Sequence, residues 1–271
     1  MVKSSRASKV AVITGAASGL GRALACNLAR QGWTIAVADI NETGSEETLR
    51  QVRALGGDGA CFRVDVTNAQ VIEDLAEDVY TLWGRCDMLI NNAGVASTGA
   101  IGKVPLEDWR WCIDIDLMGP IYGCHAFVPR MQRQGFGHII NVASIAGYAM
   151  GRRMGPYNVA KSGVIALSET LRAELEGTNI GVTVVCPGFF LTGIANTMRF
   201  TDKREQDATR KLTGGSNMTV EDVAAAVLKT AQRGGGYVVM PRYAQMIFWA
   251  RRLFPAGATA LLSRISGRRK S

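Results

Sequence analysis

The amino-acid sequence predicts a single α/β domain with a doubly wound, seven-stranded parallel sheet and helices on both faces. Short continuous apolar runs, which are typical of strands buried on both faces, alternate with helix-length segments along the chain. Many of these segments end at glycine, as strand–helix turns and helix ends do. A chain of 271 residues, of which 47% are hydrophobic, is long enough to bury such a core.

The predicted elements follow one another in a regular order. The first strand is KVAVITG at 9–15, and apolar residues at helical spacing then predict a helix over 19–32. The remaining strands are predicted at 34–39, 60–66, 86–94, 137–144, 181–188 and 237–241, with clear helical patterns at 41–57, 155–164 and 221–236. In such a sheet, ligands bind at the carboxyl ends of the strands.

The chain divides into four stretches. Residues 1–8 are a tail, and residues 9–241 form the predicted α/β domain, to which the motifs described below assign nucleotide binding and catalysis. Within that domain, 189–218 is an irregular insertion that is apolar early and polar late, which favours a lid over a pocket, with a plain surface loop as the alternative. Residues 242–271 form a basic extension whose first part has the pattern of an amphipathic helix.

Composition excludes several classes of function. Only two histidines are present, so a histidine metal site or a Ser-His-Asp hydrolase is not expected, and no metal is predicted. The net charge of +8 comes without a nucleic-acid recognition module, so no nucleic-acid partner is predicted. The six scattered cysteines indicate buried thiols in a reducing compartment. Without an apolar leader or a spanning run, we expect a cytoplasmic protein.

The segment TGAASGLG at 14–21 joins the first strand to the first helix. Gly15, Gly19 and Gly21 permit a tight turn and a close approach to a pyrophosphate, which the following helix N-terminus attracts. A glycine-rich turn also occurs for packing alone. Its place after the first strand favours dinucleotide binding, with Ser18 and Leu20 in the same turn.

Asp39 ends the second predicted strand. A carboxylate at this place accepts hydrogen bonds from ribose hydroxyls and repels a 2′-phosphate, so we expect NAD rather than NADP. Arg22 is near in sequence, but it stands at the start of the helix and need not face that phosphate.

Tyr157 and Lys161 lie four residues apart in a helical segment, on one face and one turn apart. The pair is either an ordinary surface pair or a tyrosine whose proton the lysine controls. The pair alone does not decide between these alternatives.

Taken together, the motifs resemble those of the short-chain dehydrogenase/reductase family from about Lys9 to Pro241. They occur in the family's order: TGAASGLG, DV at 65–66, NNAG at 91–94, Ser144, YNVAK at 157–161 and PG at 187–188. The resemblance implies a Rossmann fold and a dehydrogenase or ketoreductase activity that uses a nicotinamide cofactor. It also implies cofactor contacts for Asp65, Val66, Asn91, Asn92, Ala93, Gly94, Tyr157, Lys161, Pro187, Gly188 and Thr192.

The resemblance gives Tyr157 the role of general acid and base. Free tyrosine has a pKa of about 10, and we expect the positive charge of Lys161 to favour the phenolate. Ser144 is expected to hydrogen-bond the substrate oxygen. Asp116 stands where the family usually has asparagine in its proton relay, so we expect it in the catalytic group, with an altered lysine pKa or pH optimum as a consequence.

The predicted substrate pocket is apolar and adaptable, so the substrate is expected to be a lipophilic alcohol or ketone. Arg152 and Arg153 suggest the alternative of an acidic, carrier-bound substrate, as in a beta-ketoacyl reductase. A sensor or structural subunit that binds NAD without turnover is an alternative of another class. The expected lining residues are Met150, Met154, Phe189, Phe190 and Ile194.

Two expectations concern assembly. The family resemblance implies a homodimer or homotetramer. The basic amphipathic pattern of RYAQMIFWARRLF indicates a peripheral membrane contact, with packing against the chain itself or a second subunit as the alternative.

Overall fold

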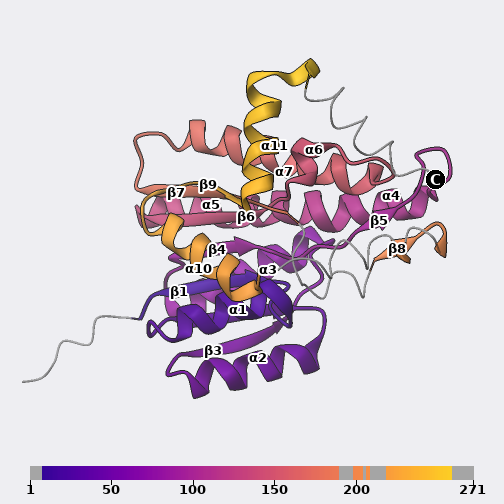
Figure 1. The fold of residues 1–271 in the computed structure, drawn as a ribbon. Helices are drawn as coiled ribbons and strands as arrows, with labels where there is room; N and C mark the ends of the chain where they lie inside the picture. Colours follow the sequence, from indigo (N-terminus) through magenta and orange to yellow (C-terminus); the bar gives the residue numbers. More distant parts are fainter. Residues whose placement is uncertain (1–7, 189–197, 204–205, 208–217, 258–271) are drawn as a thin grey trace, which may run out of the picture.

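The structure is a computed structural model that describes residues 8–188, 198–203, 206–207 and 218–257 (Figure 1). Most of the predicted lid at 189–218 therefore lies outside the described residues, as do the tail at 1–7 and the end of the basic extension at 258–271.

A seven-stranded parallel sheet forms the centre of the molecule, as predicted. Its strand order is β3-β2-β1-β4-β6-β7-β9, which reverses direction at β1 and is that of a doubly wound sheet. The strands are β1 (Val10–Thr14), β2 (Thr34–Asp39), β3 (Asp58–Arg63), β4 (Met88–Asn91), β6 (Gly137–Val142), β7 (Ile180–Pro187) and β9 (Gly235–Met240).

Helices cover both faces of this sheet (Figure 1). One face packs against α1 (Gly19–Ala29), α2 (Glu42–Ala54) and α10 (Val220–Ala231). The other packs against α3 (Ala69–Trp83), α5 (Gly119–Gln134) and α7 (Gly155–Glu174). Shorter helical segments are α4 (Leu106–Ile113), η1 (Asp114–Met118) and α6 (Ala146–Ala149), and α11 (Arg242–Leu253) follows the last strand.

The strand β1 explains why the strands read as continuous apolar runs. All five of its residues are buried. Ala11 and Ile13 pack on the α1 and α10 side, whereas Val10 and Val12 pack on the α3 and α5 side. Since successive side chains of a strand point to opposite faces, a sheet with helices on both sides requires apolar residues at every position.

Three local features were not expected from the sequence. A second, two-stranded parallel sheet pairs β5 (Ser97–Thr98) with β8 (Arg199–Phe200), and so ties one end of the predicted lid to the segment before α4. The segment η1 is a π-helix, a form that is rare and frequent at functional sites. Finally, the thiol of Cys61 is exposed, whereas the other five cysteines are buried and all six are free.

The helix α11 begins the basic C-terminal extension and packs on the main domain. Ala244 and Phe248 are buried, and the Phe248 ring makes edge contacts with Tyr148. The opposite side of α11 exposes large apolar side chains, namely Tyr243, Met246, Trp249 and Leu253. No helix among the described residues is long and apolar enough to cross a membrane. Peripheral membrane contact stays a prediction.

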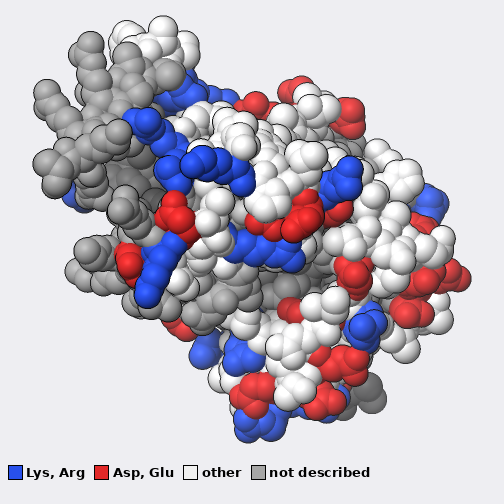
Figure 2. All heavy atoms as spheres, turned by 90° about the vertical axis from the view of Figure 1, so that its right-hand side faces the viewer, with Lys and Arg blue, Asp and Glu red and all other residues white. Residues whose placement is uncertain are grey.

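Charged side chains are unevenly spread over the face that carries α4, β5 and β8. Lys and Arg gather toward the upper left of this face (Figure 2). Two of the arginines near the predicted lid are paired, Arg153 with Asp202 at 3.0 Å and Arg199 with Asp108 at 2.7 Å. Arg199 also stacks on the ring of Trp111, 4.0 Å from its centroid. The positive charge beside the lid is thus partly neutralised.

Candidate active site

A cavity of about 530 Å³ opens at the carboxyl ends of the parallel strands. This is the place that the topology of the sheet indicates for a ligand. It brings together most of the predicted site residues: Gly15, Ser18, Gly19, Leu20, Asp39, Asp65, Val66, Asn92, Ala93, Gly94, Ser144, Met154, Tyr157, Lys161, Pro187 and Gly188.

The glycine-rich turn after β1 is shaped by close approaches of the backbone. Gly15 has a φ of +64°, and a Cβ there would lie 2.8 Å from the Cα of Ala93. Gly21 does not line the cavity; a Cβ there would lie 2.2 Å from the carbonyl oxygen of Gly15, so its role is packing. Ser18, the N-cap of α1, makes no side-chain capping bond within the described structure. The N-terminal amides of α1 are therefore available to an anion at the cavity.

Thr14 is a site residue that sequence analysis missed. Its hydroxyl oxygen accepts hydrogen bonds from the backbone N–H groups of Asn92 at 3.0 Å and Ala93 at 3.1 Å. The Asn92 side chain donates in return to the carbonyl oxygens of Thr14 at 2.9 Å and Gly15 at 3.1 Å. These bonds fix the ends of β1 and β4 against each other. The threonine that opens TGAASGLG was the available signal.

Asn91 corrects one expectation, because its side chain does not line the cavity. It donates to Asn141 Oδ1 at 2.8 Å, and Asn141 donates to the hydroxyl of Ser168 at 3.0 Å. A Cβ at Gly123 would lie 2.2 Å from Asn91 Oδ1, so α5 approaches closely there. Asn91 points to the α5 and α7 side of the sheet, since side chains alternate along β4. Its role is structural.

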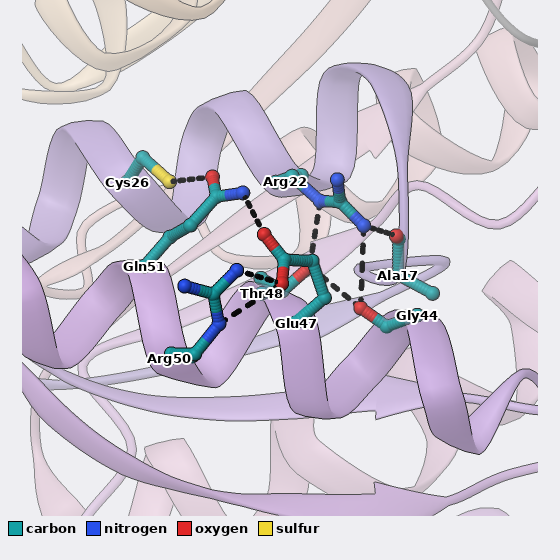
Figure 3. Close-up of polar contacts among 8 residues, drawn as sticks. All are labelled: Ala17, Arg22, Cys26, Gly44, Glu47, Thr48, Arg50 and Gln51. Atoms are coloured by element: carbon teal, nitrogen blue, oxygen red, sulfur yellow. Dashed lines mark hydrogen bonds and ion pairs between the residues drawn. The ribbon is translucent and has the colours of Figure 1, made fainter.

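Asp39 and Arg22, the two charged residues near the glycine-rich turn, point in different directions. Asp39 lines the cavity, and its carboxylate accepts hydrogen bonds from the backbone N–H groups of Ala17 and Asn41, both at 2.9 Å. Arg22 turns toward α2, where it donates to Thr48 Oγ1 at 2.9 Å and to the carbonyl oxygens of Ala17 and Gly44 (Figure 3). The hydrogen bonds of the Arg22 side chain thereby join α1 to α2.

At the other end of the cavity, Ser144 stands near enough to Tyr157 to act on the pKa of its phenol, which it lowers. Tyr157 lies in the first turn of α7, and Ser144 follows β6. The Ser144 hydroxyl oxygen accepts a hydrogen bond from the N–H of Ala146 at 3.1 Å, which orients it. Both side chains line the cavity, so they can meet one substrate oxygen.

Lys161 is held one turn further along α7. It is 3% exposed, and its Nζ donates to the carbonyl oxygen of Val142 at 3.0 Å. The same nitrogen lies 5.7 Å from the centroid of the Tyr157 ring and 3.9 Å from Asp116 Oδ2. The surface-pair interpretation of Tyr157 and Lys161 is therefore wrong, because the lysine charge is buried beside the site.

Asp116 does not line the cavity and lies behind Lys161, in the π-helix η1. It is fully buried, and its Oδ1 accepts a hydrogen bond from the N–H of Val95 at 2.7 Å. Burial raises the pKa of Asp116 to about 6, against the opposing effects of the Lys161 charge and the Val95 N–H. At neutral pH the group is thus a buried carboxylate.

The pKa of Tyr157 departs from the sequence-based expectation. Burial raises it well above its ordinary value, the negative charge of Asp116 raises it further, and Ser144 opposes both effects. The expected lowering of the Tyr157 pKa by Lys161 does not dominate in this structure, because burial of the phenol has the largest effect. The protein alone therefore holds Tyr157 in its protonated form.

Only part of the predicted substrate lining is found in the cavity. Met154 lines the cavity, whereas Met150 is 45% exposed and lines a neighbouring groove with Tyr148 and Arg251. The backbone of Met150, the C-cap of α6, is left-handed, which ends that helix. Phe189, Phe190, Thr192 and Ile194 lie outside the described residues. Among the residues that are described, no three His, Cys, Asp or Glu side chains form a group suited to a metal ion.

The cavity fits a dinucleotide by its own features. Backbone approaches at Gly15 leave no room for a side chain, the N-terminus of α1 is free to bind an anion, and Asp39 offers a carboxylate at the end of β2. Tyr157 and Ser144 stand at the opposite end. One ligand spanning these groups would have a pyrophosphate in its middle and its reacting ring beside Tyr157.

Comparison with known proteins agrees with this geometry. The sequence profile of the short chain dehydrogenases matches residues 9–203. Over 203 residues the chain is 36% identical to the probable oxidoreductase EphD of Mycobacterium bovis, which covers 73% of this chain and 34% of EphD. The chain thus spans about a third of the length of that relative. It is also 33% identical, over 85% of its length and 93% of the relative's, to the 3-oxoacyl-acyl-carrier-protein reductase FabG of Thermotoga maritima.

A solved structure is similar over nearly the whole chain. A short chain dehydrogenase/reductase from Burkholderia phymatum, solved in complex with NAD, superimposes with a TM-score of 0.85 at 30% identity. The match covers 90% of this chain and 93% of that one. The profile match, the relatives and this fold agree. The chain belongs to the short-chain dehydrogenase/reductase family.

Proposed function

We propose that this protein transfers a hydride between NAD and a lipophilic alcohol or ketone, with Tyr157 as general acid and base. The observation that carries the proposal is the meeting of Ser144, Tyr157 and Lys161 at one end of a cavity whose other end carries Asp39. The bound nicotinamide supplies the hydride acceptor or donor; the protein supplies the rest of the chemistry.

Each of the three residues has a distinct task. The Tyr157 phenol gives its proton to the oxygen of a carbonyl substrate, or takes a proton from an alcohol in the reverse direction. Ser144 donates a hydrogen bond to the same oxygen and stabilises the charge that develops on it. Lys161, fixed by the Val142 carbonyl, supplies a positive charge near the phenol, and we assign it the contact with the ribose of the cofactor.

The preference for NAD rests on Asp39 and Arg22. The carboxylate of Asp39 lines the cavity and would repel a 2′-phosphate. The guanidinium of Arg22, the nearest candidate to balance such a phosphate, is bonded to Thr48 and two carbonyl oxygens on the other side of the turn. A similar protein from Burkholderia phymatum was solved with NAD.

The preference for a lipophilic substrate rests on the side chains around Tyr157. Beside the polar Ser144, Tyr157 and Lys161, the cavity wall carries many apolar side chains, among them Val95, Ala96, Ile145, Ala149, Met154 and Met198. A pocket of this kind binds an apolar body and fixes its single oxygen by the two hydroxyls.

A carrier-bound acyl substrate is the second candidate. It is supported by the similarity to the FabG reductase and by the exposed Arg152, which follows the cavity-lining Gly151 in the chain. Because Arg153 and Arg199 are already paired with aspartates, a strongly acidic partner would have less free positive charge to meet. The small lipophilic substrate is therefore preferred.

The test is an absorbance assay at 340 nm with a panel of lipophilic alcohols and ketones, carrier-bound ketoacyl substrates, and both nicotinamide cofactors. We expect turnover with NAD and a loss of about 100-fold or more in Tyr157→Phe. Tyr122→Phe, on α5 and outside the cavity, is the matched control and should behave as the unsubstituted protein. Full activity of Tyr157→Phe would refute the proposed role. NAD binding without any turnover would favour the non-catalytic sensor.

A further inference from the structure

The buried side chains behind Tyr157 carry two opposite charges that are unequally hydrogen-bonded. Lys161 Nζ donates to the Val142 carbonyl oxygen at 3.0 Å and lies 3.9 Å from Asp116 Oδ2, beyond hydrogen-bond distance. Asp116 Oδ1 accepts from the Val95 N–H, but Oδ2 has no hydrogen-bond partner among the described residues. A buried carboxylate oxygen without a partner is costly, so its presence calls for a functional reason.

The approach of these two groups depends on Gly94. A Cβ at this position would lie 3.1 Å from Asp116 Oδ1 and 3.3 Å from Lys161 Nζ. Both distances are at the lower limit of ordinary contacts. Because Gly94 has no side chain, no atom of this residue stands between the carboxylate and the ammonium. Both groups lie where water reaches poorly, and charges interact strongly in such a region.

Few other ionisable groups face Asp116. On α7 these are Lys161 and Tyr157, and on α4 the thiol of Cys112. Burial raises the pKa of Cys112 to about 12, with Asp116 adding to the effect, so this thiol stays neutral. The two charges beside Tyr157 are consequently one ammonium, that of Lys161, and one carboxylate, that of Asp116.

We propose that Asp116 is a positioning residue that offsets the charge of Lys161 and thereby keeps Tyr157 protonated, so that the site is set for carbonyl reduction. This inference rests on the proposed function and adds a direction to it. In reduction, hydride from a reduced nicotinamide forms the new C–H bond at the carbonyl carbon. The Tyr157 proton passes to the carbonyl oxygen, and solvent then reprotonates the phenolate.

The variant Asp116→Asn tests the inference, because it keeps the shape and an acceptor for Val95 while it removes the charge. The ionisation of Tyr157 is followed by NMR of protein with ¹³C-labelled tyrosine, and the Tyr157 signal is assigned by its loss in Tyr157→Phe. We expect Tyr157 to begin to ionise at a pH lower by about one unit in Asp116→Asn than in the unsubstituted protein. In the same variant, the pH profile of alcohol oxidation, which needs the phenolate, should shift downward equally.

Asp116→Ala separates charge from packing. It removes the charge as well as the acceptor for Val95, so it should shift the Tyr157 titration in the same direction as Asp116→Asn. A Tyr157 titration that is the same in Asp116→Asn and in the unsubstituted protein would overturn the inference, even if Asp116→Ala lost activity.

The NMR titration needs no turnover, which keeps the two proposals apart. A shifted titration in a protein that turns over no substrate would refute the proposed function and leave the charge relation standing. Turnover with an unshifted titration would refute this inference and leave the proposed function standing.

Discussion

At the amino end of β6, the buried His138 shares a 2.8 Å hydrogen bond with the hydroxyl of Thr183 on β7. Beyond the carboxyl end of the same strand, Lys161 bonds to the Val142 carbonyl while Asp116 keeps one carboxylate oxygen without a partner among the described residues. Both ends bury polar groups. Among the described residues at these two ends, the carboxyl end carries the buried Lys161–Asp116 ion pair and a carboxylate oxygen with no hydrogen-bond partner, whereas at the amino end His138 and Thr183 bond to each other.

The middle of β6 resembles the amino end. Asn141 accepts from Asn91 and donates to Ser168, which closes a buried network across β4, β6 and α7. Closed networks stabilise a fold and fix its strand pairing. Buried polar groups along this one strand therefore have two uses. Groups whose hydrogen bonds are all made stabilise the fold, whereas a charge that lacks a hydrogen bond lies where chemistry is expected.

The strongest test of this comparison is Lys161→Met. It leaves the Asp116 carboxylate buried without its counter-charge, which should lower the free energy of unfolding by about 3 kcal/mol. It also removes the positive charge near the Tyr157 phenol, so turnover should fall by about 100-fold or more. Urea unfolding and the 340 nm assay measure the two effects. Lys229→Met, an exposed position on α10, is the control and should change neither.

At the amino end, Thr183→Val should affect stability alone. It leaves His138 buried without its partner and should lower the free energy of unfolding by about 2 kcal/mol, as measured by urea unfolding. Turnover of the folded variant should be unchanged. The double variant His138→Leu/Thr183→Val removes both partners and should recover part of the loss. A large fall in turnover for Thr183→Val would contradict the distinction between the two ends.

Local patterns in the sequence predicted most of the fold and much of the site. The seven strands were predictable because both faces of the sheet are covered, so each strand is apolar throughout. Family motifs in a fixed order predicted Ser144, Tyr157 and Lys161, and the structure brings the three together at one cavity; their catalytic roles stay predictions. The predicted role of Asp39 follows from its place at the end of β2.

What the sequence did not predict depends on contacts between distant segments. The direction of Asn91 is decided by its partner on β6, 50 residues away. Met150 lines a neighbouring groove instead of the cavity and has a left-handed backbone, and no motif signals either feature. The raised pKa of Tyr157 needs the burial of the ring and the charge of Asp116, which spacing along α7 alone does not show.

The smallest effect we predict is the pH dependence of stability at the amino end. Burial lowers the pKa of His138 to about 4, below its ordinary value of about 6.5 in the unfolded chain. The folded state thus favours the neutral ring. The stability linked to this is fully present above pH 6.5 and is lost as the pH falls toward 4.

Urea unfolding at pH 7 and pH 5 compares the unsubstituted protein with His138→Gln, whose side chain does not titrate. Between these two values, the free energy of unfolding should fall by about 1 to 2 kcal/mol more in the unsubstituted protein. The carboxylate of Asp116 acts with the opposite sign, since its raised pKa favours the folded state on acidification, but it is present in both proteins and cancels in the difference. An equal loss in the two proteins would show that protonation of His138 does not destabilise the folded state. The contrast between the two ends of β6 would then rest on charge alone.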